Sequence, residues 1–360
     1  MTSTAGTKRD GSAKAAGGPA RAYALAGLLA AAALVLRGAL PGSSAAVPSA
    51  SVLALVLGLL VGALPGVRAT AGRGAGRVTK ATIPWAIVLI GFGLDLGPLL
   101  RSGSLAAGLG ITVALMAVAF LGALLGARAL GLSRDAGLLL GAGTAVCGNS
   151  AIMAVAPAID ADDDEVGLSI GVINLLGVLM LFALPPLAGA LGVAAEEGGA
   201  LAGLTVHAVP QAIATGGAFG ERALEWATLY KLLRVALLVP VVLLVSVLVG
   251  RRSGDAPRAR VPLFVPLFVA AAVLRGLGWA DAEVRVPGLG AEGLGSEGPA
   301  PLWAQLKAVG RIALAVALAA IGLGLDLRSL VRVGPRFLLA GLIALVPPVA
   351  LGLALVRWAV

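Results

Sequence analysis

The sequence predicts an all-α polytopic membrane protein. Hydrophobic residues make up 59% of the 360 positions and charged residues 12%, with a mean hydropathy of +1.00. A soluble domain is about half apolar and about a quarter charged, so a water-facing surface could not accommodate this composition. Apolar runs also recur at about the 20-residue length that a membrane-spanning helix needs. These observations leave no room for a sizeable domain outside the membrane.

Residues 1–21 are small, polar and basic, so we expect a disordered cytoplasmic tail. Residues 22–360 then form a single transmembrane domain. Another span closely follows the first apolar run, so we interpret that run as a retained helix rather than a signal peptide. The eleven predicted spans cover residues 22–40, 47–64, 80–97, 103–127, 136–157, 166–191, 200–219, 225–249, 261–280, 303–325 and 335–358.

The charges between spans predict an orientation. Basic clusters at residues 68–80 and 251–260 fall on one side of an eleven-span chain, and the acidic run at 160–165 falls on the other. The positive-inside rule then places the N-terminus in the cytoplasm and the C-terminus outside. The net charge of +9 is spread among these short connections, which argues against a nucleic-acid partner.

An internal repeat predicts inverted topology. Residues 90–103 read IGFGLDLGPLLRSG and residues 321–334 read IGLGLDLRSLVRVG, with nine of fourteen positions identical. The copies lie seven crossings apart, so 90–127 and 321–358 should run in opposite directions. Inverted repeats are typical of alternating-access secondary transporters. Asp95 and Asp326 in these segments suit helix capping more than ion binding.

The fifth span concentrates polar groups at its centre. Thr144, Cys147, Asn149 and Ser150 lie around Gly148, and at helical spacing Thr144, Cys147 and Ser150 would share a face. Glycine also permits a broken helix, whose free N–H groups would suit an anion. The alternative is close helix packing, with the hydroxyls bonded to their own backbone.

The seventh span predicts a second broken helix. Pro210 removes a backbone donor and disfavours helix at the residue before it. The only histidine of the chain, His207, lies beside this break, with Gln211 and Thr215 one and two turns on. A buried histidine is often only structural, but its place beside a break makes it a candidate for substrate binding.

Three further polar residues lie inside predicted spans. Asn174 could bind substrate or form a helix–helix hydrogen bond. Lys231 and Arg234, on one face of the eighth span, could coordinate an anion or snorkel to the membrane surface. Several enzyme signatures are absent from the sequence: there is no HExxH, P-loop or paired cysteine set. We therefore expect no enzyme activity, no cofactor and no metal.

The same segments resemble a known family. TAVCGNSAIMAVAPAI, EVGLSIGVINLLGVLMLFALPPL, TVHAVPQAIATGGAFG and ATLYKLLRVALLVPVV, in that order, resemble the YeiH-type sulfate exporter family of the cation/proton-antiporter and bile-acid-symporter-like clan. The resemblance implies a bacterial inner-membrane transporter, with broken helices in a core, a separate scaffold and often a homodimer. In this family a small residue is usual where Asn149 stands, and often an acid where Ala208 stands.

The sequence therefore leaves four functions open, the last of which is a membrane scaffold. The first is a secondary transporter of a small anion, such as sulfate or a sulfonate, in the lipid bilayer. The second is a sodium- or proton-coupled carrier of an organic solute. The third is an intramembrane enzyme that uses Ser150 or Cys147 with His207.

Overall fold

The computed structural model confirms the all-α class. It describes residues 17–39, 49–64, 66–67, 70–71, 73–94, 104–249, 263–287, 289–290, 293–294, 298–325 and 334–360. Most of the predicted tail lies outside these residues, although the first helix already begins at Gly17. By length and composition, six described helices could each cross a membrane, and three shorter apolar helices accompany them.

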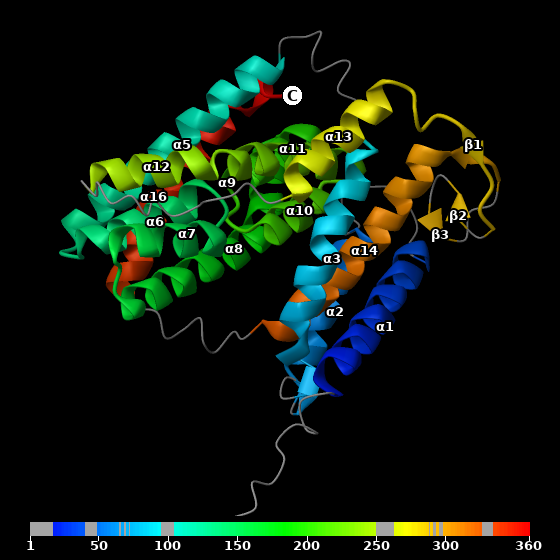
Figure 1. Cartoon of the computed structure of the whole chain (residues 1–360), viewed down its shortest axis with the longest axis horizontal. Coiled ribbons are helices and arrows are strands. Elements are labelled where there is room, and N and C mark those ends of the chain that lie inside the picture. The colour runs from blue at the N-terminus through cyan, green and yellow to red at the C-terminus, as the bar shows by residue number, and fades with distance from the viewer. Residues whose placement is uncertain are drawn as a thin grey trace, which may run out of the picture.

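Four helices pack together in what we call the four-helix group, coloured blue and orange in Figure 1. They are α1 (Gly17–Ala39), α2 (Ala50–Gly62), α3 (Arg73–Gly91) and α14 (Leu302–Gly324). Glycines bring α2 against α14: a methyl group added to Gly58 would lie 2.2 Å from the carbonyl oxygen of Ala319, and one on Gly322 would lie 2.3 Å from that of Leu55. Small residues permit such close helix contact in membranes.

The remaining long helices form a second body, the broken-helix group. It contains α5 (Ser104–Ala129), α6 (Arg134–Ala145), α7 (Asn149–Ile159), α8 (Asp163–Ala190), α9 (Ala195–Thr205), α10 (Val209–Ala218), α11 (Glu221–Ala236), α12 (Leu238–Leu248), α16 (Pro335–Leu355) and the short 3-10 helix η2 (Val356–Trp358). Helix α13 (Phe264–Gly276) packs on α3 and contacts α11, between the two groups.

Each predicted span contains at least one of these helices, and both predicted breaks are present. Between α6 and α7 the chain turns at Gly148, whose φ of 72° favours glycine. Between α9 and α10 it turns at Val206–Ala208, and Pro210 lies in the first turn of α10, where its missing N–H costs nothing. The span at 225–249 is also divided, because α11 ends at Ala236 and α12 begins at Leu238.

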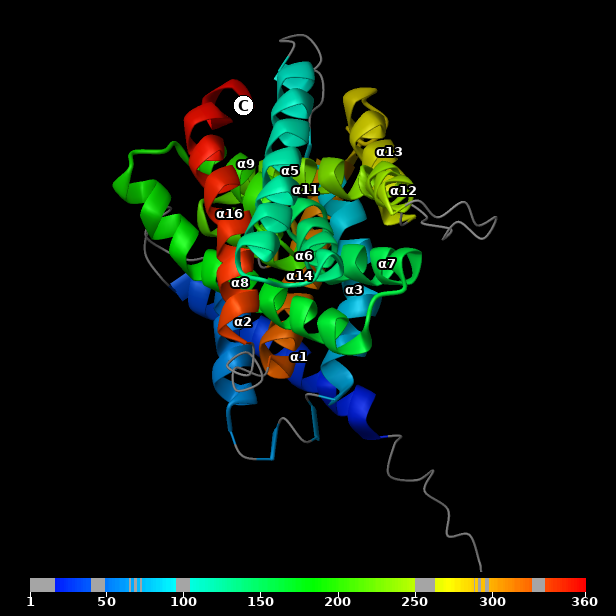
Figure 2. The same cartoon turned by 90° about the vertical axis from the view of Figure 1, so that its left-hand side faces the viewer.

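The helices of the predicted repeat lie in opposite directions. Helix α3 runs antiparallel to α14, and α5 runs antiparallel to α16, in both views (Figures 1 and 2). In each pair the two helices pack against one another. This is the arrangement that an inverted repeat would produce. Superposition of 90–127 on 321–358 stays a prediction, and Asp95 and Asp326 lie outside the described residues.

Four short strands, which the sequence did not predict, precede α14. Strands β1 (Glu283–Val284) and β4 (Ala300–Pro301) pair antiparallel, as do β2 (Leu289–Gly290) and β3 (Gly293–Leu294). The side chain of Gln305 donates to the carbonyl oxygens of Val284 and Ala300, so α14 holds the base of this ribbon.

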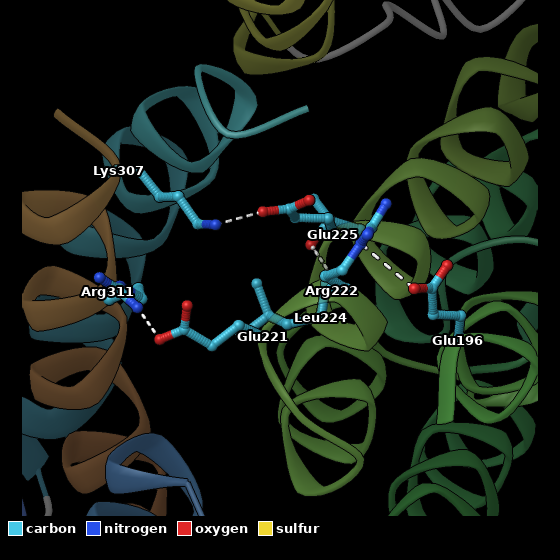
Figure 3. A network of polar contacts seen from close by, with 8 residues as sticks. Glu196, Glu221, Arg222, Leu224, Glu225, Lys307 and Arg311 are labelled. Carbon is cyan, nitrogen blue, oxygen red and sulfur yellow. Dashed lines mark hydrogen bonds and ion pairs between the residues drawn. The ribbon is translucent and has the colours of Figure 1, made fainter. Parts of the chain in front are cut away.

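Ion pairs join the two groups. Lys307 and Arg311 of α14 point toward Glu225 and Glu221 of α11 and pair with them, as Figure 3 shows. The Lys307 and Glu225 side chains are 14% and 12% exposed, so water screens this pair less than a surface pair. A buried apolar cluster that includes residues of α3, α11 and α13 accompanies these contacts.

Candidate functional site

The two helix breaks meet at one place. A methyl group on Gly148, between α6 and α7, would lie 3.7 Å from both the Cα atom and the backbone nitrogen of Ala208, between α9 and α10. Four helix ends therefore come together: the C-terminal ends of α6 and α9, and the N-terminal ends of α7 and α10. Such ends expose carbonyl or N–H groups that have no partner within the helix.

Helix α11 passes close enough to donate hydrogen bonds to the free carbonyl groups at the C-terminal ends of α6 and α9. Two glycines of α9 permit this approach, because a methyl group on Gly199 would lie 2.1 Å from the carbonyl oxygen of Ala223, and one on Gly203 would lie 2.4 Å from that of Ala227. The next turns of α11 carry Lys231 and Arg234, which are 0% and 2% exposed.

The Lys231 ammonium donates to three backbone carbonyls. Its Nζ atom lies 2.8 Å from the oxygen of Val146 and 2.9 Å from that of Val206, and it also bonds that of His207. An ammonium has three donors, so all of them are used. One carbonyl comes from the first break and two from the second, so Lys231 ties the breaks together.

The Arg234 guanidinium binds the last turns of the same two helices. Its Nε atom donates to Ala145 at 2.9 Å, and Nη2 donates to Thr144, both at the end of α6. Its Nη1 atom donates to Leu204 at 2.7 Å, near the end of α9. The fork of donors on an arginine suits several acceptors at once.

These contacts exclude one of the two alternatives for Lys231 and Arg234, which is snorkelling to the membrane surface. Neither side chain snorkels, since both charged heads are buried against backbone. Among the described residues, no carboxylate forms an ion pair with either cation. The carbonyl ends of two helices supply about half a negative charge each, so the junction keeps a net positive charge.

The N-terminal ends of α7 and α10 are joined through α8. The Asn149 amide donates to the Asn174 side chain at 3.0 Å, and the Gln211 amide lies 3.5 Å from the Asn174 carbonyl oxygen. Gln211 also accepts a hydrogen bond from the backbone N–H of Ala208 at 3.2 Å. Gly177 of α8 makes room for Gln211, because a methyl group there would lie 2.0 Å from its Oε1 atom.

Several polar atoms at the junction have no hydrogen-bond partner in the described part of the chain. They are both ring nitrogens of His207, the Thr144 hydroxyl and the Asn149 Oδ1 atom. His207 is 0% exposed. Buried polar atoms normally find partners, so these atoms are candidates for ligand contact. Ser150 in the first turn of α7 is exposed.

Two further predicted site residues, Thr215 and Cys147, interact within their own segment of the chain. The Thr215 hydroxyl donates to the carbonyl of Gln211, within its own helix. Cys147 is a free, buried thiol within hydrogen-bonding reach of the Ser150 side chain. The predicted shared helical face of Thr144, Cys147 and Ser150 is wrong, because α6 ends at Ala145 and Gly148 redirects the chain.

The structure also shows what the sequence missed. The buried hydroxyl of Ser169 on α8 lacks a hydrogen-bond partner among the described residues. Its position five residues before Asn174, in the same apolar span, could have marked it as a candidate site residue. The acceptors of Lys231 and Arg234 are backbone carbonyl groups, which every residue type has, so the sequence could not identify them. His207 makes no hydrogen bond to Ser150 or Cys147, and no group of three metal-ligating side chains occurs in the part searched, which is the described one.

The fold and the site together define a multi-pass helical membrane protein whose two discontinuous helices meet at a buried cationic junction. The chain belongs to the family described as conserved hypothetical protein 698, which matches residues 24–341.

Relatives in this family are known as UPF0324 membrane proteins. The chain is 34% identical over 286 residues to blr3189 of Bradyrhizobium diazoefficiens, which covers 78% of this chain and 75% of the relative. It is 33% identical over 267 residues to Atu0671 of Agrobacterium fabrum, covering 74% and 72%. A relative in Lactiplantibacillus plantarum is 31% identical over 289 residues, covering 75% and 78%. No solved structure matches the chain.

Gly177→Ala should destabilise the junction through Gln211. The new methyl group displaces the Gln211 side chain and leaves the Ala208 N–H uncapped, which should cost about 1–3 kcal/mol. Thermal unfolding in detergent measures this. In a Gln211→Ala background the same substitution should cost much less, because the clash is gone.

Gly167→Ala on the same helix is the matched control, since nothing lies within 4 Å of a methyl group there. It should be neutral or slightly stabilising. If Gly177→Ala is as harmless as Gly167→Ala, Gln211 does not hold the position described.

Proposed function

We propose that this protein is a secondary active transporter of a small anion that works by alternating access. The observation that carries the proposal is the pair of buried cations, Lys231 and Arg234, which have no carboxylate partner among the described residues. They lie where two discontinuous helices meet. Broken helices in an inverted-repeat membrane protein are typical of substrate sites in secondary transporters.

The charge of the junction favours an anion over a cation. Lys231 and Arg234 add two positive charges, while the ends of α6 and α9 offset about one of them. The N-terminal ends of α7 and α10 add about half a positive charge each. A cationic or neutral solute would gain nothing from this field, whereas an anion beside Ser150 would be stabilised by it.

The available donors suit an oxyanion. The first N–H groups of α7, at Asn149 and Ser150, belong to the set that a helix leaves unpaired, and the Ser150 hydroxyl is exposed beside them. His207 and Thr144 bring further unpartnered polar atoms. Sulfate and sulfonates carry three or more acceptor oxygens, so they can use donors from several directions. The resemblance to sulfate exporters supports the same substrate class.

The two helical groups suit a moving core and a static scaffold. The site lies wholly within the broken-helix group, on α6–α11. That group meets the four-helix group through a limited set of contacts, among them the ion pairs of α14 with α11. We propose that the broken-helix group moves against the four-helix group in a homodimer of the bacterial inner membrane. The N-terminus is cytoplasmic and the C-terminus is outside.

Uptake and counterflow in proteoliposomes test the proposal. The substrates are sulfate, thiosulfate, sulfite, taurine and small carboxylates, with sodium, lysine and glucose as non-anionic comparisons. We expect saturable flux of at least one oxyanion. Ser150→Ala should weaken its binding at least about 10-fold, because one hydrogen bond to a charged group is worth about 1.5 kcal/mol or more.

Ser246→Ala on α12 is the matched control, because that hydroxyl only donates to the carbonyl of Val242 in its own helix. It should transport like the parent protein. Absence of flux for every anion, or flux of a non-anionic solute alone, would rule the proposal out.

Cross-linking α14 to α11 should stop transport. Cysteines in place of Lys307 and Glu225 stand where the ion pair joins the two groups (Figure 3), and a short bifunctional thiol reagent would bridge them. We expect flux to fall at least 10-fold on cross-linking with a disulfide-cleavable reagent and to return on reduction.

Each single cysteine variant, treated with the same reagent, controls for damage to the buried Cys147. Full transport by the cross-linked protein would show that the two groups need not move apart at this contact.

A further inference from the structure

We propose that Lys231 occupies a cation site built from backbone carbonyls, and so serves as a tethered substitute for a dissolved cation. The site is the set of carbonyl oxygens of Val146, Val206 and His207, which we call the carbonyl cage. The cage follows from the contacts alone. Only its consequence for coupling, given at the end of the argument, rests on the proposed function.

The geometry of the cage is that of an ammonium site. The Lys231 Nζ atom lies 2.8 Å from Val146 O and 2.9 Å from Val206 O, which are lengths of charge-assisted hydrogen bonds. The third oxygen, that of His207, completes the three acceptors that an ammonium can use. The oxygens come from two helix breaks and face one point from different chain segments.

The cage carries the charge that a cation requires. Its oxygens lie at the C-terminal ends of α6 and α9, where each helix places about half a negative charge. Backbone carbonyls in unwound helix segments coordinate sodium or protons in transporters with discontinuous helices. In this chain the cage is filled by its own side chain, which is 0% exposed.

Arg234 does not fill the same place. It bonds the carbonyls of Thr144, Ala145 and Leu204, one turn or less before the cage residues. Of the three cage oxygens it reaches that of Val206, at the longer distance of 3.3 Å. Removal of the Lys231 side chain should therefore empty the cage and leave the Arg234 contacts in place. The vacated space is polar and lined by hydrogen-bond acceptors, so it suits a small hydrated cation or an ammonium ion.

The consequence for transport is that no dissolved cation is needed at the junction. A coupling ion that bound the carbonyl ends would have to displace a covalently attached ammonium. The proposed anion transport should then run equally well in sodium and in choline salts. This separates the anion transporter from the sodium-coupled carrier that the sequence left open.

Chemical rescue of Lys231→Ala tests the cage. The full-length protein in detergent is unfolded by heat in choline, sodium, ammonium or methylammonium chloride at equal ionic strength. We expect the unfolding temperature of the parent protein to be the same in all four salts. The variant should unfold well below the parent in choline, and methylammonium should raise its unfolding temperature by on the order of 5 °C in a saturable manner.

Lys231→Met is the matched control. Its side chain fills most of the lysine volume, carries no charge and leaves no room for an added cation. It should be destabilised in choline and should gain nothing from methylammonium.

Three results with Lys231→Ala would overturn the proposal: it is as stable as the parent in choline, methylammonium and ammonium stabilise it no more than they stabilise Lys231→Met, or it folds in none of the salts. A fourth contradicting result concerns the parent protein, which sodium should not stabilise more than choline does. The parent measurement needs no variant, so it decides even if Lys231→Ala folds poorly. All of these measurements are independent of transport, so failure of the anion transport screen would not contradict the cation site.

Discussion

Carbonyl groups at the end of a helix must be paired when that end lies inside a membrane protein, and this constraint organises the molecule. Water is not available there to satisfy them, and each unpaired group costs several kcal/mol. Helices α6 and α9 both end in the interior of the broken-helix group. Lys231 and Arg234 of α11 satisfy the carbonyls of both ends at once. A helix that ends within the bilayer is possible here because a third helix supplies the donors.

The same contacts position the rest of the site. Helix α11 can deliver its cations because Gly199 and Gly203 let it approach α9. Once the carbonyl ends are fixed, the N-terminal ends of α7 and α10 start so close together that a methyl group on Gly148 would contact Ala208, and Asn174 joins them from α8. Two cations buried without a carboxylate partner among the described residues would be costly alone. Carbonyl dipoles offset part of that cost, and the positive charge that remains is available to an anion.

Sequence reasoning located the elements better than it located the contacts. The spans and both breaks were predictable because apolar length, Gly148 and Pro210 act locally. The partners of Lys231 and Arg234 were not predictable, since a backbone carbonyl has no residue type to recognise. The shared face of Thr144, Cys147 and Ser150 failed for a related reason: helical spacing was applied across a residue, Gly148, that ends the helix. The ion pairs of Glu221 and Glu225 likewise join segments far apart in the chain.

Pulsed electron–electron spin resonance between labels on α7 and α10 tests the central claim most directly. Labels at Met153, which is exposed on α7, and at Ala218, the last residue of α10, report how firmly the two half-helices are held. The parent protein should give one narrow distance distribution. The double variant Lys231→Met/Arg234→Met, which leaves the carbonyl ends of α6 and α9 without both of their shared donors, should broaden it or shift its mean. An unchanged distribution in Lys231→Met/Arg234→Met would contradict the claim that the buried cations hold the junction together.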